Sequence, residues 1–197
     1  MKVIGLTGGI GSGKSAVTEY LTGMGFVIID ADKISHEITE KGSGTLLKLK
    51  SAFGDDILFD DGCLNRKKLA SIVFSDREKK QLLESIVTRN VIDICDERCA
   101  EYAKAGREKA VFLDAPLLFE TGMNEKTDLV WVVTAEMDLR VQRVMKRDNA
   151  TYDEVYSRIR NQMSDEERIA KADAIIDNSR SLNYLYGQVK ELVNKYV

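Results

Sequence analysis

The chain contains few of the residues that build covalent frameworks or rigid turns. Its 197 residues include one proline, one histidine and three cysteines. Three cysteines cannot all pair with one another, and Cys63, Cys95 and Cys99 form no C-x-x-C motif. Disulfide frameworks and zinc sites need more ligands at tighter spacings. We therefore expect three ordinary thiols.

Strong charge of one sign and long apolar runs are also missing. The 29 lysines and arginines against 32 aspartates and glutamates give a net charge of −3, which argues against a nucleic-acid or membrane-surface partner. No apolar run is long enough to span a bilayer, and the first residues resemble a strand rather than a signal peptide. We expect a cytoplasmic protein without nucleic-acid or membrane partners, and a monomer, with a homo-oligomer left open.

Five short apolar runs alternate with amphipathic, helix-like segments. They lie at residues 3–6, 26–29, 110–113, 129–133 and, more weakly, 174–176. A long helical stretch separates the second run from the third. Continuous apolar strands between helices are typical of a parallel sheet that is covered on both faces, where ligands bind at the carboxyl ends of the strands. The length suffices for one such α/β domain with an insertion.

The first strand leads into a glycine-rich segment. Residues 8–15 fit the pattern G-x-x-x-x-G-K-[ST], and a helix-like segment follows at 16–21. Glycines can turn backbone N–H groups toward a polyphosphate, Lys14 can reach the β- and γ-phosphates, and Ser15 can hold Mg²⁺. The alternative is a glycine-rich turn without a ligand. The flanking strand and helix favour a phosphate-binding loop, or P-loop.

The second strand ends in two nearby carboxylates, Asp30 and Asp32. Side chains two residues apart on a strand share one face, so either could act as a general base or hold a Mg²⁺-bound water. Either could instead cap a following helix, expected at residues 33–40. We leave Asp30 open and assign chemistry to Asp32. His36 lies on the same helical face as Asp32, at the rim of the site or on the surface.

A further carboxylate, Asp114, ends the third strand. A residue there can assist the metal or its waters, although it could also be structural. Residues 115–120 contain Pro116 and Leu117 and end in Glu120, which makes a rigid apolar corner suited to lining a pocket. Taken alone, this segment would be read as a turn.

Three arginines recur after the fourth strand at spacings of three and four residues. Arg140, Arg143 and Arg147 should share one stripe of a helix, while Val141 and Val144 pack on the opposite side. Such a stripe attracts phosphate, or else it is a solvated charged face. Capping-box patterns begin at residues 151 and 164, so residues 140–168 are expected to form a helical lid over nucleotide.

These motifs together resemble the dephospho-CoA kinase family from end to end. The resemblance is carried by residues 5–15, 29–32, 53–54, 64–66, 116–120, 147–148, 172–173 and 177–178. Members transfer the γ-phosphoryl group of ATP to the ribose 3′-hydroxyl of dephospho-CoA. The resemblance implies a P-loop NTPase fold, a three-layer α/β/α arrangement with a parallel sheet. It places the nucleotide-binding core at residues 1–32 and 106–197, the lid at about 140–168, and a helical acceptor-binding domain at 33–105.

The resemblance also implies roles for individual residues. The catalytic residues would be Asp32, Lys14 and Arg143. ATP would be bound by Gly9, Gly11, Ser12, Gly13, Lys14, Ser15, Ala16, Arg147, Gln162 and Asn178, the last two near the base. The acceptor would be bound by Asp32, His36, Arg66, Pro116, Leu117 and Glu120. Mg²⁺ is the implied cofactor, held by Ser15 and by Asp114, the latter directly or through water.

The chain departs from the family pattern at three places. Ala16 stands where Thr is usual, Arg140 stands where Gln is expected, and residues 87–89 replace the usual His-Pro of the substrate-domain helices. The last change alters the expected acceptor pocket. Two other functions fit the motifs: a kinase for another small hydroxyl acceptor such as a nucleoside or sugar, and a non-catalytic nucleotide-binding regulator. No Asn-Lys-x-Asp motif for reading guanine is present.

Overall fold

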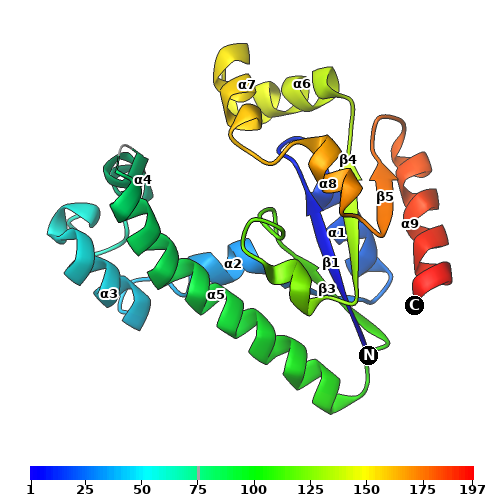
Figure 1. The fold of residues 1–197 in the computed structure, drawn as a ribbon, viewed down its shortest axis with the longest axis horizontal. Coiled ribbons are helices and arrows are strands. Elements are labelled where there is room, and N and C mark those ends of the chain that lie inside the picture. Colours follow the sequence, from blue (N-terminus) through cyan, green and yellow to red (C-terminus); the bar gives the residue numbers. More distant parts are fainter. Residues whose placement is uncertain (75) are drawn as a thin grey trace. The chain divides into compact units, whose positions relative to one another are not determined.

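The computed structural model describes residues 1–74 and 76–197 and divides the chain into two compact units (Figure 1). The first unit, Met1–Ile29 with Cys99–Val197, is here called the nucleotide unit, and the second, Asp30–Arg98, the helical unit. The sequence-based boundaries were 32/33 and 105/106. The two units meet in the chain at 29/30 and 98/99, and the second of these boundaries lies inside the long helix α5 (Arg77–Ala105).

The sheet has five strands in the order β2-β3-β1-β4-β5. They are β1 (Lys2–Gly8), β2 (Val27–Asp30), β3 (Ala110–Asp114), β4 (Leu129–Thr134) and β5 (Ala174–Asp177). β1 pairs in parallel with β3 and β4, and β4 pairs in parallel with β5. All five strands expected from the sequence are confirmed, and β3 is buried along its whole length because both faces of the sheet are covered.

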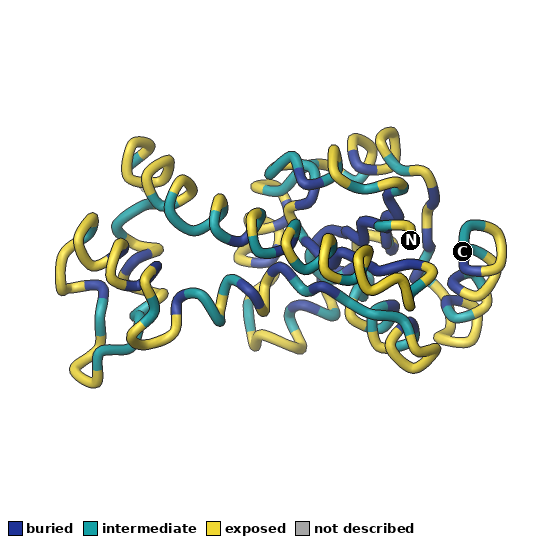
Figure 2. Tube along the Cα trace, turned by 90° about the horizontal axis from the view of Figure 1, so that it is seen from below, coloured by how far each residue is buried: buried dark blue, intermediate teal, exposed yellow. Residues whose placement is uncertain are grey.

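Two helices bury their apolar sides on one face of this sheet. Val17 and Leu21 of α1 (Lys14–Gly23) and Leu185 and Val189 of α9 (Leu182–Tyr196) join one core with the strands. On the other face, α8 (Asp165–Ala170) contacts β4, and Leu118 packs close to β1. Figure 2 shows the buried residues concentrated along the strands. The expected α/β fold of the P-loop class is confirmed.

Helices α6 (Met137–Asp148) and α7 (Tyr152–Arg160) form a small cluster of their own. Val144 and Val155 are buried there, with Ile10 packed against them. Both expected capping boxes are present, at the start of α7 and at the start of α8. Each box satisfies two backbone N–H groups that a helix start would otherwise leave without acceptors.

The helical unit contains α2 (Ala31–Glu37), α3 (Gly44–Phe53), α4 (Arg66–Phe74) and most of α5. Its core is built on Leu49, Ile57 and Leu69. A short 3₁₀ turn, η1 (Asp55–Ile57), and an isolated bridge between Leu58 and Leu64 connect α3 to α4. A second turn of this type, η2 (Met123–Lys126), belongs to the nucleotide unit.

Cys63, Cys95 and Cys99 are thiols in the structure. Among the helices of the described residues, none combines the length and apolarity that a bilayer crossing requires.

Candidate active site

The P-loop connects β1 to α1 and closes on itself through its backbone. The Ser12 N–H donates to the Gly9 carbonyl oxygen at 3.0 Å. Gly13, the N-cap of α1, has a φ of 87°, and a Cβ on it would lie 2.0 Å from the Asn178 Nδ2 atom. Both the left-handed backbone and the close side chain therefore require glycine at position 13.

The first turn of α1 supplies the groups that bind an anion. Lys14 and Ser15 open this helix. The first backbone N–H groups of a helix have no acceptor within it and carry the positive end of its dipole. A phosphate placed at this end is stabilised by both effects, as in other phosphate-binding loops.

Lys14 forms an ion pair with Asp114, the last residue of β3. The β1–β3 register places Leu6 opposite Asp114, which brings the end of β3 beside the start of the loop. Both side chains are largely buried: that of Lys14 is 16% exposed and that of Asp114 is 8% exposed. A charge-assisted hydrogen bond in such surroundings fixes the lysine next to the loop.

Side chains from the C-terminal half of the chain form hydrogen bonds to the backbone of the loop. Gln162 accepts from the Ile10 N–H at 2.9 Å, and Asn178 donates to the Ser12 carbonyl at 2.8 Å. Arg143 in turn donates to the Asn178 carbonyl at 2.9 Å. The predicted roles of Gln162 and Asn178 near the base stay predictions. In the structure, both side chains form hydrogen bonds to the backbone of the loop and so fix its conformation.

The expected stripe of three lid arginines is not uniform, which corrects the sequence interpretation. Arg140 is only 1% exposed: its Nε donates to the Ile10 carbonyl at 2.9 Å, and its Nη1 pairs with Asp165. It lies next to Val141 on α6, so burial of that apolar side takes Arg140 with it. Arg147, by contrast, is exposed and pairs with Asp148.

Sequence reasoning missed two members of this site, Asp165 and Arg168. Arg168 is 1% exposed and contacts Asp165 and Glu120 through its two terminal nitrogens, at 3.5 and 3.4 Å. One signal was available: the capping box at Ser164 predicts a helix in which Asp165 and Arg168 are three residues apart. Their burial, however, depends on tertiary contacts.

The corner after β3 directs its side chains to different sides. The Pro116 carbonyl accepts from the Thr7 hydroxyl at 3.2 Å, which ties the corner to β1. Leu118 is fully buried, whereas the neighbouring Leu117 is 49% exposed. Glu120 contacts Arg168 as described above. The roles of Pro116, Leu117 and Glu120 toward an acceptor stay predictions.

In the helical unit, the arrangement of the two aspartates differs from the expectation. β2 ends at Asp30 and α2 begins at Ala31, so Asp30 and Asp32 do not share a strand face. Asp30 is the N-cap of α2 and accepts from the Lys33 N–H at 2.9 Å. Asp32 lies in the first turn, and both it and His36 are exposed. Capping, the alternative left open, is therefore the role of Asp30.

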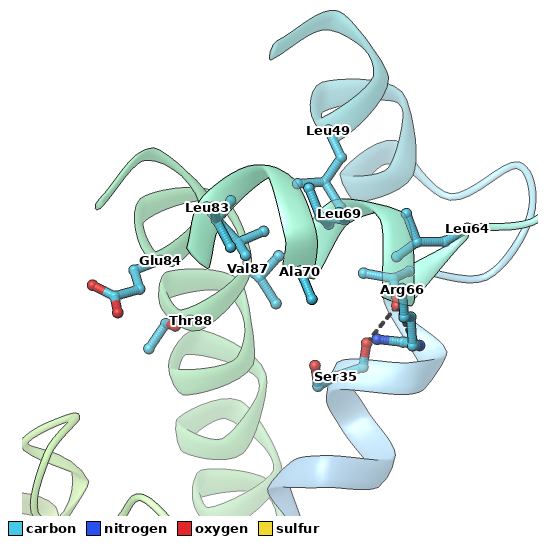
Figure 3. Close-up of a pocket in the computed structure, with 12 residues that line it drawn as sticks. Ser35, Leu49, Leu64, Arg66, Leu69, Ala70, Leu83, Glu84, Val87 and Thr88 are labelled. Carbon is cyan, nitrogen blue, oxygen red and sulfur yellow. Dashed lines mark hydrogen bonds between the residues drawn. The ribbon is translucent and has the colours of Figure 1, made fainter. Parts of the chain in front are cut away.

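The helical unit also contains a pocket of about 300 Å³ (Figure 3). Arg66 lies at one end of the view, while Glu84 and Thr88 lie at the other. Arg66 donates to the Thr39 hydroxyl at 2.6 Å. The walls between them are mostly apolar and include Leu49, Leu64, Leu69, Ala70, Val73, Leu83 and Val87. Val87 and Thr88, two residues of the segment 87–89 that stands in the place of the usual His-Pro, line this pocket.

Comparisons with known proteins agree with the motifs. The family model described as "Dephospho-CoA kinase" matches residues 2–183. The dephospho-CoA kinase of Corynebacterium efficiens is 44% identical over 190 residues, 96% of this chain and 94% of that protein. The structure of TT1252 from Thermus thermophilus has a TM-score of 0.86 and 33% identity, covering 100% of this chain and 98% of the other. The dephospho-CoA kinase structure from Campylobacter jejuni has a TM-score of 0.74 and 30% identity, covering 98% and 96%. The chain belongs to the dephospho-CoA kinase family.

Proposed function

We propose that this protein transfers the γ-phosphoryl group of ATP to the ribose 3′-hydroxyl of dephospho-CoA, giving coenzyme A and ADP. The observation that carries the proposal is a glycine-rich loop with Lys14 fixed beside it, in a chain that matches the family over residues 2–183. Phosphoryl transfer asks the protein mainly for positioning and for stabilisation of negative charge. A P-loop with a held lysine supplies both.

On the nucleotide side, we assign the phosphates to the loop and the first turn of α1. Lys14 would exchange Asp114 for a phosphate oxygen and offset charge on the transferred group. Arg143 and Arg147 would add positive charge from α6, and Arg143 already contacts the loop at the Gly11 carbonyl. The full set of proposed ATP-binding residues is Gly9, Gly11, Ser12, Gly13, Lys14, Ser15, Ala16, Arg147, Gln162 and Asn178.

On the acceptor side, we assign the general base to Asp32. An exposed carboxylate at the start of α2 can accept a proton from a substrate hydroxyl without breaking a structural contact. We assign acceptor binding to His36 and to Arg66, whose guanidinium lines the pocket of Figure 3. Pro116, Leu117 and Glu120 complete the proposed acceptor set.

The donor set near the loop fits Mg²⁺. The Ser15 hydroxyl and the Asp114 carboxylate are oxygen ligands, and Mg²⁺ in such sites uses one or two protein oxygens together with phosphates and water. Among the described residues, no group of three or more His, Cys, Asp or Glu side chains is placed to hold a metal ion. Bound with ATP, the ion would neutralise charge on the β- and γ-phosphates.

The test is ADP release from Mg·ATP with and without dephospho-CoA, followed by phosphorus NMR of the product. Acceptor-dependent ADP and a new 3′-phosphate are the expected results. Stimulation by a nucleoside or sugar instead of dephospho-CoA would replace the acceptor assignment. If the protein bound ATP tightly but released no ADP with any of the acceptors tested, it would be a non-catalytic regulator and the proposal would be overturned.

A further inference from the structure

Two buried arginines and two carboxylates form an ionic cluster inside the nucleotide unit. Arg140 of α6 and Arg168 of α8 both pair with Asp165, and Arg168 also contacts Glu120. Each arginine is 1% exposed. The two positive and two negative charges balance, so removal of any single member leaves an uncompensated charge with restricted access to water.

This cluster packs directly against the P-loop. A Cβ on Gly9 would lie 2.3 Å from the Arg140 Nη2 atom and 3.2 Å from the Arg168 Nη1 atom. The Arg140 Nε also donates to the Ile10 carbonyl at 2.9 Å. The Arg140 guanidinium therefore lies against Gly9 and Ile10, and a side chain on Gly9 would displace it.

Stability alone is a weak explanation for such a cluster. Buried ion pairs can often be replaced by apolar residues without loss of stability, because desolvation offsets the charge attraction. Here the hydrogen bonding is also incomplete. Among the described residues, the buried Nε of Arg168 has no hydrogen-bond partner, and the contacts of its two terminal nitrogens are long, at 3.4 and 3.5 Å. The burial of this cluster costs free energy, and the cluster contacts the P-loop through Arg140 and includes Glu120. These features point to a role in positioning.

We propose that Arg140 is a positioning residue of the P-loop, and that Asp165 and Arg168 link it to Glu120, so that nucleotide binding and acceptor binding are energetically coupled. The link to the acceptor rests on the proposed function, in which Glu120 belongs to the acceptor site. The effect on the nucleotide does not depend on which acceptor is used. Coupling of this kind is reciprocal: each ligand raises the affinity for the other by the same factor.

The nucleotide part is tested by calorimetric titration of Mg·ADP, without any acceptor. Arg140→Leu removes the contacts to Ile10 and Asp165, and we expect its dissociation constant to rise at least tenfold. Arg140→Lys keeps a positive charge for Asp165, but its single nitrogen cannot replace the separate contacts of the guanidinium to Ile10 and Asp165. Its dissociation constant should therefore lie between those of wild type and Arg140→Leu. Lys146→Leu makes the same change of charge on an exposed position of the same helix and should bind like wild type.

A folded Arg140→Leu protein with wild-type affinity for Mg·ADP would overturn the positioning role. If that variant does not fold, Arg140→Lys decides: wild-type affinity in it overturns the proposal, and weakened affinity supports it. A merely structural arginine would lower the unfolding temperature of the variants while the folded molecules bound ADP normally.

The coupling is tested by titrating dephospho-CoA with and without a saturating non-hydrolysable ATP analogue. Wild type should bind the acceptor more tightly with the analogue, and in Asp165→Asn this factor should fall toward one. An unchanged factor in Asp165→Asn, or a factor of one in wild type, would overturn the coupling. Failure of wild type to bind dephospho-CoA at all would defeat the proposed function instead, while the Mg·ADP titrations would still decide the role of Arg140.

Discussion

Lys14 and Asp114 form an ion pair because β1 and β3 are neighbours in the sheet, although 100 residues separate the two side chains in the chain. The lysine follows β1 through the loop, whereas the aspartate ends β3. The ion pair holds Lys14 beside the P-loop, where we propose that the phosphates of ATP bind. A pre-positioned charge needs little reorganisation when ligand arrives, which is the condition under which electrostatic stabilisation is most effective.

Replacement of Lys14 by alanine should nearly abolish turnover. The variant loses the ammonium group that offsets charge on the transferred phosphoryl, and loss of one such group typically lowers kcat by about 10²–10³-fold. The measurement is acceptor-dependent ADP release, with far-UV circular dichroism to establish that the fold is retained. Lys190→Ala, at an exposed position on α9, is the matched control. Activity of Lys14→Ala within a few-fold of this control would contradict the role of Lys14.

Asp32→Asn should lower kcat much more than it weakens ATP binding. The amide keeps the size of the carboxylate but cannot accept the proton, and general-base catalysis typically contributes about 10²–10⁴-fold. Asp30→Asn is a close control, because Asn caps a helix as well as Asp does and the bond to the Lys33 N–H can persist. Steady-state kinetics on both variants separate the two effects. Near-wild-type turnover of Asp32→Asn would show that another group takes the proton.

Hydrophobic pattern and turn chemistry predicted most of the fold from sequence. The five strands could be predicted because their apolar runs are short and bounded, and α7 and α8 because Thr151 and Ser164 begin capping boxes. The end of β2 was less accurate. Because α2 begins at the residue directly after β2, no loop residues mark the boundary between them. Asp30 and Asp32 were therefore expected on one strand face, although Asp32 already belongs to α2.

The site was predictable only where a local motif contains the chemistry. The glycines, Lys14 and Ser15 lie in one short segment, so the sequence alone predicts a joint role for them. The pairing of Arg140 with Asp165 is not, because it depends on how α6 and α8 pack on the sheet and on the loop. From helical periodicity alone, an arginine on an amphipathic helix is expected on the solvent side, and only the tertiary acceptors at Ile10 and Asp165 allow its burial.

The capping box of α7 should make the start of this helix sensitive to acid. Hydrogen bonds from the backbone N–H and then the hydroxyl of Thr151 hold the pKa of Glu154 below its ordinary value of 4.5. A carboxyl whose pKa is lower in the folded state stabilises the fold above its unfolded pKa, and this stabilisation is lost as pH falls through the folded pKa. Acidification below the ordinary glutamate range should therefore loosen the start of α7.

Carbon-13 NMR of the Glu154 carboxyl group, titrated from neutral to acidic pH, measures this directly. The Thr151→Ala variant retains the backbone donor but loses the hydroxyl, so the pKa of Glu154 should move part of the way back toward its ordinary value. In Glu154→Gln, the backbone chemical shifts at the start of α7 should no longer show the transition that the Glu154 carboxyl causes. A Glu154 pKa at or above the ordinary value in wild type would refute this account of the box.

Two glycine-to-alanine substitutions should have opposite effects on stability. At Gly13 the φ of 87° and the Asn178 amide 2.0 Å from the added Cβ both oppose alanine. The left-handed conformation alone costs roughly 1–2 kcal/mol, and displacement of Asn178 would also break its hydrogen bond to the Ser12 carbonyl. Gly187 lies inside α9 with open space where a Cβ would lie, so alanine there should raise the free energy of unfolding by about 0.5–1 kcal/mol.

Urea denaturation and Mg·ADP titration on both variants measure these effects. Gly13→Ala should lose stability and nucleotide affinity together, whereas Gly187→Ala should gain stability at unchanged nucleotide affinity. Wild-type ADP affinity in Gly13→Ala would mean that the loop does not bind phosphate in the conformation described.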